Sequence, residues 1–213
     1  MLTQSICLMA PKRRVRTLRS LSVLAGLTLV ALGGPLMGSA QAAGTACPSS
    51  TTSTPFAPWG DTNAYSLVAG GSFESASNGW TLSGGAARVA GSDTFAITGS
   101  LGQWSLSLPS AAAAQSPVQC VEPNERTFRF MGHSVGSEAT VRVDLVYATS
   151  TGNITIAGKK VTLKKSWEPS PILATGALLV TAVTGESAHL SLHFTTLSGS
   201  AVIDDVFIDP RMR

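Results

Sequence analysis

Few groups in this 213-residue chain could do acid–base or nucleophilic chemistry, and none carries a local signature. Glu122 and Glu125 share a short stretch and could act as a glycosidase pair, but this needs a defined separation that the sequence does not fix. His133 could join a Ser-His-Asp arrangement only through folding. The chain has no Gly-x-Ser-x-Gly elbow, phosphate loop or His-Glu-x-x-His motif. We therefore expect a protein that is not an enzyme.

Aromatic side chains are the better candidates for a binding role. A sugar ring has an apolar face and a rim of hydroxyls, so it suits an exposed aromatic ring with hydrogen-bonding groups beside it. Trp104 stands beside Gly102 and Gln103 at a strand start, and we predict it as a ligand platform. Trp59 and Tyr147 are the other two candidates. Trp59 lies among prolines and could instead pack under the N-terminal segment.

The first 42 residues have the three parts of a secretory signal peptide. Basic residues occupy 12–19, an apolar run covers 21–37, and Ala40-Gln41-Ala42 forms a small-residue cleavage site. A twin-arginine leader is disfavoured because Val15-Arg16 follows Arg13-Arg14. No second apolar run of membrane-spanning length follows. We expect a secreted mature chain, free of the membrane after cleavage.

Cleavage changes both the charge and the cysteine count. The chain has 15 Lys+Arg and 12 Asp+Glu, and five of the bases lie in the leader, which leaves ten bases against twelve acids. A nucleic-acid partner would need a basic surface, so we exclude one. Cys7 leaves with the leader. Cys47 and Cys120 remain and are expected to form a disulfide in an oxidising compartment, with two free thiols as the alternative.

The remaining residues predict one all-β domain, which we expect to be a monomer. Residues 43–64 form a Ser/Thr/Pro-rich lead-in that the disulfide would tether, and the domain proper covers 65–213. Apolar and polar residues alternate in its strands, so each sheet has one buried face. Gly- and Ser-rich turns separate them. We expect an antiparallel two-sheet jelly-roll sandwich of about nine to eleven strands, with no convincing helix. The expected strands are 94–98, 105–108, 127–131, 140–147 and 189–194.

Several short motifs occur in a characteristic order along the chain: Gly71-Ser72-Phe73-Glu74, Gly79-Trp80-Thr81, the 105–108 strand, residues 126–131, Trp167 and Ile203-Asp204-Asp205-Val206. This order resembles that of galactose-binding-like jelly rolls, in particular the carbohydrate-binding modules of bacterial xylanases and glucanases. The resemblance covers Tyr65 to Pro210 and implies a carbohydrate-binding function. The segment from Phe56 through Glu74 also resembles small secreted proteins of high-GC Gram-positive bacteria.

In those modules the Glu of the first motif and the first Asp of the last strand help to hold a structural calcium. The resemblance therefore assigns Glu74 and Asp204 as calcium ligands, and calcium favours six to eight oxygen ligands. Asp204 shares a strand face with Val202 and Val206, and a buried carboxylate there would need a cation or donors. Alternation leaves open the opposite phase, in which Asp205 is buried.

We thus expect a secreted, non-catalytic module that binds carbohydrate or another cell-surface polymer. The alternative is a structural or protein-interaction domain on the same fold, without a sugar site.

Overall fold

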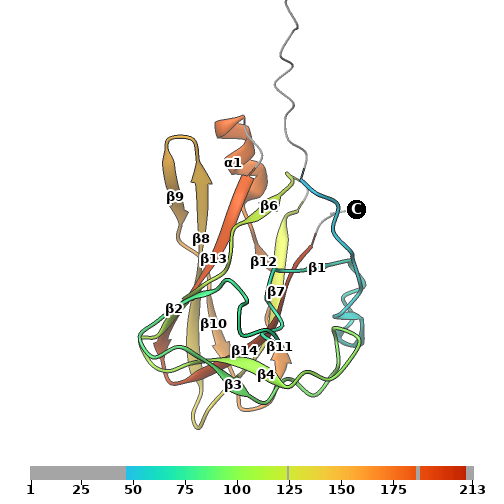
Figure 1. Ribbon diagram of the computed structural model, residues 1–213, viewed down its shortest axis with the longest axis vertical. Coiled ribbons are helices and arrows are strands. Elements are labelled where there is room, and N and C mark those ends of the chain that lie inside the picture. The colour runs from blue at the N-terminus through green and yellow to red at the C-terminus, as the bar shows by residue number, and fades with distance from the viewer. Residues whose placement is uncertain (1–46, 124, 186–187, 210–213) are drawn as a thin grey trace, which may run out of the picture. The chain divides into compact units, whose positions relative to one another are not determined.

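Alternating apolar residues place two sheets face to face in the computed structural model, which describes residues 47–123, 125–185 and 188–209 (Figure 1). Every strand pairing in both sheets is antiparallel. The predicted two-sheet jelly roll is confirmed. The predicted signal peptide, residues 1–42, lies outside the described residues.

The first sheet, here called sheet 1, contains both the first and the last strand of the domain. Its strands are β1 (Ser66–Leu67), β3 (Ala87–Ala90), β4 (Trp104–Leu108), β7 (Thr127–Ser134), β11 (Glu168–Pro169), β12 (Leu173–Ala174) and β14 (Ala201–Asp209). The order is β11-β7-β14-β4-β3, with β1 added to β14 and β12 to β7. The C-terminal strand therefore lies inside the sheet, between β7 and β4.

The second sheet, here called sheet 2, is built around the long pair β8 and β13. Its strands are β2 (Thr81–Ser83), β5 (Ala113–Gln115), β6 (Gln119–Val121), β8 (Ala139–Thr149), β9 (Gly152–Ile156), β10 (Lys160–Leu163) and β13 (Ala188–Ser198). The order is β10-β8-β13-β5-β2, with β9 added to β8 and β6 to β13.

The main core lies between the two sheets and contains the residues that alternation predicts. Phe73 and Trp80 pack with their ring centroids 4.9 Å apart, and Phe194 contacts both Trp80 and Phe130. These rings join the aliphatic rows of both sheets in one continuous cluster. The cluster includes Phe73, Trp80, Leu106, Leu108, Phe128, Phe130, Val141, Val143, Leu145, Leu190, Leu192 and Phe194.

A second, smaller apolar cluster covers the outer face of sheet 1. Met131 of β7 and Phe207 of β14 point away from the main core and meet Phe56 and Tyr65 of the lead-in. The 3-10 turn η1 (Ala57–Trp59) follows Phe56, and a bridge between Ser53 and Tyr65 closes the segment. The Cys47–Cys120 disulfide is present, as predicted. The described part of the lead-in, residues 47–64, therefore packs against the sandwich.

A buried ion pair fastens this second cluster. Arg129 donates to the Asp61 carboxylate at 2.7 Å and to the Ser170 carbonyl, and its guanidinium lies 4.6 Å from the Phe56 ring centroid. Burial alone would raise the pKa of Asp61, but hydrogen bonds from Tyr65 and Arg129 hold it below its ordinary value. The pair is satisfied on all sides, which a buried charge requires.

Two local predictions are wrong. Residues 177–184 form the helix α1 (Ala177–Thr184), although no helix was expected. Residues 94–98 form turns instead of a strand, and Ala96 adopts a left-handed conformation with φ 52°.

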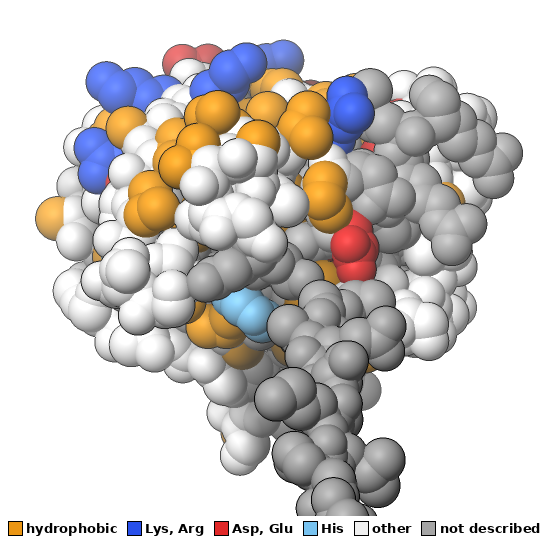
Figure 2. Space-filling model, turned by 90° about the horizontal axis from the view of Figure 1, so that it is seen from above, with side chains coloured by type: hydrophobic (Ala, Val, Ile, Leu, Met, Phe, Trp, Pro, Cys, Tyr) orange, Lys and Arg blue, Asp and Glu red, His pale blue; other side chains and the backbone are white. Residues whose placement is uncertain are grey.

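The sequence does not predict helix α1, because the helix is apolar on its exposed side as well and so lacks the apolar–polar periodicity of a surface helix. Leu178, Leu179 and Val183 are 50%, 64% and 74% exposed. Figure 2, which views the molecule from the end where Figure 1 shows α1, has hydrophobic side chains gathered on this face. No helix among the described residues is long and apolar enough to span a bilayer.

Candidate metal and ligand-binding site

A β-bulge in β14 gathers three carboxylates at one point. Pairing with β7 shifts register between Asp204 and Phe207, and Asp205 adopts φ 47°. The bulge reverses the phase of the strand, so that Ile203 and Val206 both face the main core. The two phases left open by the sequence are therefore both used, one on each side of the bulge. Asp204 and Asp205 are both buried.

Asp93 completes this group, here called the carboxylate cluster. Oxygens of Asp93, Asp204 and Asp205 lie within 4.8 Å of one another, and all three residues are buried. Asp204 accepts hydrogen bonds from the Ser92 hydroxyl at 2.7 Å, from the Asp93 N–H at 3.3 Å and from the Asp205 N–H at 2.8 Å.

The electrostatics of the cluster favour a cation. Burial raises the pKa of Asp204 to about 7 even though its hydrogen bonds lower it. Burial, and then the negative charge of Asp204, raise the pKa of Asp205 as well. Among the described residues no basic side chain forms an ion pair with the cluster, and a divalent cation would stabilise the charged form of its carboxylates. The donors are all oxygens, as calcium requires. The cluster therefore fits a calcium ion held by Asp93, Asp204 and Asp205.

Glu74, the other predicted calcium ligand, lies beside the cluster and outside the group of three. Its Oε1 accepts the N–H groups of Gln103 and Trp104 at 2.8 and 3.0 Å. Gly102 lies between Glu74 and Ser92. A Cβ at this position would lie 2.5 Å from Ser92 Oγ and 2.6 Å from Glu74 Oε1. Glu74 thus fixes the start of β4, while Ser92 contacts the cluster directly. Its assignment as a calcium ligand stays a prediction.

The loop between β3 and β4 joins the carboxylate cluster to an exposed aromatic pair. Gly91 N–H donates to the Gln103 carbonyl and closes the loop. Within it, Phe95 is 47% exposed, and its ring meets that of Trp59 edge to face with centroids 4.9 Å apart. Trp59 is half-buried against the second cluster. We call Trp59 and Phe95 the aromatic corner. The sequence predicts Trp59 as a ligand residue but predicts a strand at Phe95.

Trp104, the second predicted ligand residue, is half-buried at the start of β4 and has one face occupied. The Arg88 guanidinium lies 3.6 Å from its ring centroid. Arg88 is itself held by the carbonyls of Phe73 and Glu74. Such a cation–π contact leaves at most the opposite face of the indole for a ligand.

The prediction that Tyr147 binds a ligand does not fit the structure. The ring is fully buried in the main core, and its hydroxyl donates to the Thr175 carbonyl. Burial raises the pKa of this phenol. Tyr147 alternates with Val146 and Ala148 on β8, and the inward phase leaves no ring face for a sugar.

The outer face of sheet 2 is polar and, among its described residues, has no aromatic side chain. Arg142 and Asp144 form an ion pair at 2.9 Å, and Asp144 lies opposite His193 of β13, which in turn lies opposite Gln115 of β5. His189 is exposed on the same face. These side chains can hydrogen-bond to a polar ligand but offer no stacking surface.

The groups considered for catalysis are engaged in structural contacts. Glu122 Oε1 accepts the Cys47 N–H, and Glu125 accepts the Glu122 N–H, so this pair anchors the lead-in and its own turn. The His133 ring packs against Trp167 with centroids 4.4 Å apart.

Comparison with known proteins supports the fold and not a family membership. No protein-family model matches the sequence, and no curated protein matches it. A solved structure with the same fold comes from Clostridium thermocellum endo-1,4-beta-D-xylanase 10B, whose CBM22-1 and GH10 modules were complexed with xylohexaose. The TM-score is 0.51 and the identity 17%, over 66% of this chain and 28% of that one. This likeness is one of fold, the two-sheet jelly roll.

Other similar structures are single modules. The CBM22-1 xylan-binding domain of Paenibacillus barcinonensis Xyn10C has a TM-score of 0.47 and 13% identity, over 67% of this chain and 93% of that one. A family 11 module from Clostridium thermocellum, in complex with a beta-1,3-1,4-mixed-linked tetrasaccharide, has a TM-score of 0.45 and 14% identity, over 67% and 94%.

Proposed function

We propose that this chain is a secreted, non-catalytic carbohydrate-binding module, and that its glycan docks on the aromatic corner. One observation carries the proposal: Phe95 exposes nearly half of its surface beside Trp59, on a loop whose base is the carboxylate cluster. Covering an exposed ring of this size with a ligand is favourable because it removes apolar surface from water. The fold shared with a xylanase whose CBM22-1 and GH10 modules were complexed with xylohexaose supports a polysaccharide as the ligand.

The surroundings of the corner suit a sugar. Thr62 and Asn63 follow Trp59 closely, Thr94 precedes Phe95, and all three are exposed. Their hydroxyl and amide groups can pair with sugar hydroxyls while the two rings cover the apolar face of the sugar. The edge-to-face geometry gives an angular surface, which favours a chain end or a bent glycan over a flat crystalline one.

Calcium is the proposed structural ion of this module, with Asp93, Asp204 and Asp205 as its carboxylate ligands and Glu74 as a further predicted one. When bound, the ion supplies positive charge that offsets the buried carboxylates. Asp93 also holds the loop that carries Phe95, because its carboxylate accepts the Phe95 N–H. The ion therefore braces the corner without touching the glycan.

A glycan array followed by pull-down on insoluble polysaccharides tests the proposal with the mature chain. The variant Phe95→Ala should lose at least tenfold in affinity for whichever glycan is retained, since covering and stacking an aromatic ring contributes about 1.5 kcal/mol or more and about 1.4 kcal/mol corresponds to tenfold. Leu101→Ala is the matched control, because Leu101 is exposed on the same loop but is aliphatic. Retention by Phe95→Ala equal to that of the parent would contradict the proposed site.

A structural or protein-interaction domain is the second candidate, and the outer face of sheet 2 favours it. That face is polar and has no aromatic side chain among the described residues, so it lacks a stacking surface. If no glycan on the array is retained and the chain instead captures a purified cell-surface protein, this second function replaces the first.

A further inference from the structure

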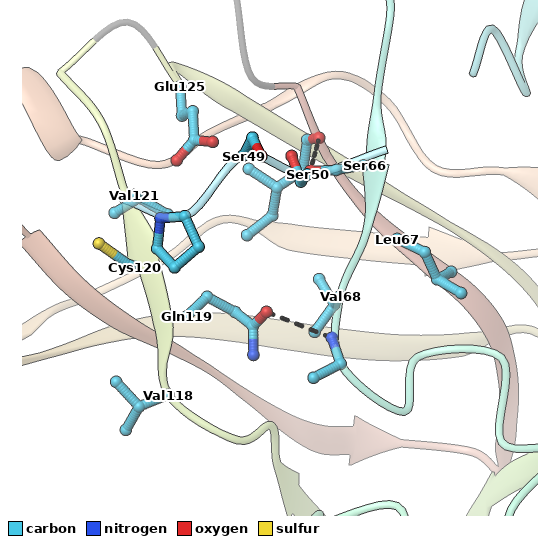
Figure 3. A pocket seen from close by; sticks show the side chains of 13 residues that line it. Ser49, Ser50, Ser66, Leu67, Val68, Val118, Gln119, Cys120, Val121 and Glu125 are labelled. Carbon is cyan, nitrogen blue, oxygen red and sulfur yellow. Dashed lines mark hydrogen bonds between the residues drawn. The ribbon is translucent and has the colours of Figure 1, made fainter. Parts of the chain in front are cut away.

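A cavity away from the aromatic corner opens where the edges of the two sheets meet. It lies between β1 of sheet 1 and β6 of sheet 2, has a volume of about 270 Å³, and is bordered by residues 48–50 next to the disulfide (Figure 3). This volume lies near the lower limit for small-molecule sites and suits one sugar ring.

The lining of the cavity is apolar on one part and hydroxyl-bearing on another. The aliphatic lining includes Leu67 and Val118, which are 40% and 56% exposed, beside the nearly fully buried Val68, Val121 and Ile208, and Ser49 and Ser50 border the cavity from the lead-in. Figure 3 shows Ser49 and Ser50 on the segment of the lead-in that runs between Glu125 and Ser66. Gln119 is already engaged, since its Oε1 accepts the Ala69 N–H. The serine hydroxyls and the aliphatic patch can thus receive the rim and the face of one ring.

Among the described residues of this lining, Glu125 is the only one with an ionisable side chain. It is 8% exposed and borders the cavity, and its Oε2 accepts the Glu122 N–H at 2.7 Å. No described residue donates to Oε1. Burial raises the pKa of Glu125 to about 7, and the nearby carboxylates of Glu122 and Asp209 act in the same direction. No Lys, Arg or His lines the cavity among the described residues. A buried carboxylate in such a place gains most from a cationic partner.

We propose that this cavity binds an amine-bearing sugar, with the ammonium group on the Glu125 carboxylate and the ring against the aliphatic part of the lining. The cationic group follows from the charge of the cavity itself. The choice of a sugar rests on the proposed carbohydrate-binding function. No covalent step is involved, and the site is separate from the aromatic corner.

Titration of the mature protein with four small probes tests this site. Glucosamine, N-acetylglucosamine, glucose and methylamine are added at pH 7, and binding is followed by NMR chemical-shift changes. Glucosamine should bind at least tenfold more tightly than the other three, which is the size expected of one charge-assisted hydrogen bond added to ring contacts. Glu125→Gln should abolish this preference, and its affinity for glucosamine should fall to that for glucose. Glu138→Gln, at an exposed glutamate between β7 and β8, is the matched control.

Each alternative outcome overturns the site. Equal binding of N-acetylglucosamine removes the role of the ammonium group, and equal binding of methylamine removes the role of the ring. Absence of glucosamine binding removes both, and none of these comparisons needs a variant. Loss of polysaccharide retention in Phe95→Ala depends on the other site, so failure of this proposal and failure of the proposed function are distinguishable.

Discussion

The Asp93 carboxylate accepts the backbone N–H of Phe95 at 2.7 Å. The same carboxylate lies within the buried group formed with Asp204 and Asp205. One residue therefore belongs to the candidate metal site and also fixes the loop of the candidate ligand site. Any change in the charge of the cluster is expected to reach Phe95 through this hydrogen bond.

Calcium should stabilise the protein and a chelator should destabilise it. An ion that binds only the folded state adds about 2.7 kcal/mol at a hundredfold excess over its dissociation constant. Asp204→Asn should erase most of this gain, because it removes a charged ligand and nearly keeps the shape. Thermal unfolding with calcium and with EDTA measures the effect. A melting temperature that ignores both additions would show that the cluster is architectural.

In the presence of a chelator, stability should fall as the pH rises from about 4 to 7. The pKa values of Glu125 and Asp204 rise to about 7 from 4.5 and 3.8, so the folded state binds more protons than the unfolded state in this window. Their contribution to stability is complete when the pH is below their pKa values in the unfolded state, and it is lost as the pH rises through their pKa values in the folded state. The lowered pKa of Asp61 acts only below about pH 4.

Urea unfolding at pH 5 and pH 8 measures this dependence. Glu125→Gln should flatten part of it and raise stability at pH 8, on the order of 3 kcal/mol as an upper bound, since one pKa unit corresponds to about 1.4 kcal/mol. Glu138→Gln should leave the slope unchanged. The same midpoint at both pH values for the parent protein would rule out the buried, neutral carboxyls.

Breaking the Asp61–Arg129 pair should be costly. Asp61→Asn leaves the Arg129 guanidinium buried without its carboxylate, and such a loss costs about 3–5 kcal/mol. Glu168→Gln is the control, because Glu168 pairs with Lys164 on the surface at 3.7 Å and should change stability by less than about 1 kcal/mol. Chemical denaturation compares the two, and equal small losses would mean that the lead-in contributes little to the fold.

The disulfide should contribute substantially to stability. Cys47 and Cys120 are 73 residues apart, and a loop of this length is worth roughly 4 kcal/mol in the chain-entropy model. Unfolding with and without a reductant measures this difference, and intact mass before and after alkylation reports the bridge. Two alkylated thiols in unreduced protein would contradict it.

Alternation predicted the main core because one-sided burial imposes a period of two on each strand. It was insufficient at β14, where the bulge at Asp205 changes which residues face inward. It misread residues 94–98, whose apolar residues alternate by chance while Asp93 folds them into turns. Helix α1 has no polar face, and only the left-handed glycines Gly176 and Gly185 at its ends mark its limits.

The candidate site was predictable only in part. The resemblance selected Asp204, but Asp93 lies 111 residues away and reaches it through a loop that the sequence describes only as a turn. The sequence does not identify Phe95 as a ligand residue, because the exposure of its ring depends on the conformation of that loop. Tyr147 was misjudged because a tyrosine in an alternating strand can face either way, and here its hydroxyl finds a partner in the Thr175 carbonyl inside the core.

Affinity electrophoresis in gels that contain the retained polysaccharide in soluble form tests the central claim most directly. The account predicts that the parent protein and Leu101→Ala are retarded equally, whereas Phe95→Ala migrates as it does in a gel without polysaccharide. Retardation of Phe95→Ala to the same extent as the parent protein would place the glycan elsewhere and contradict the account.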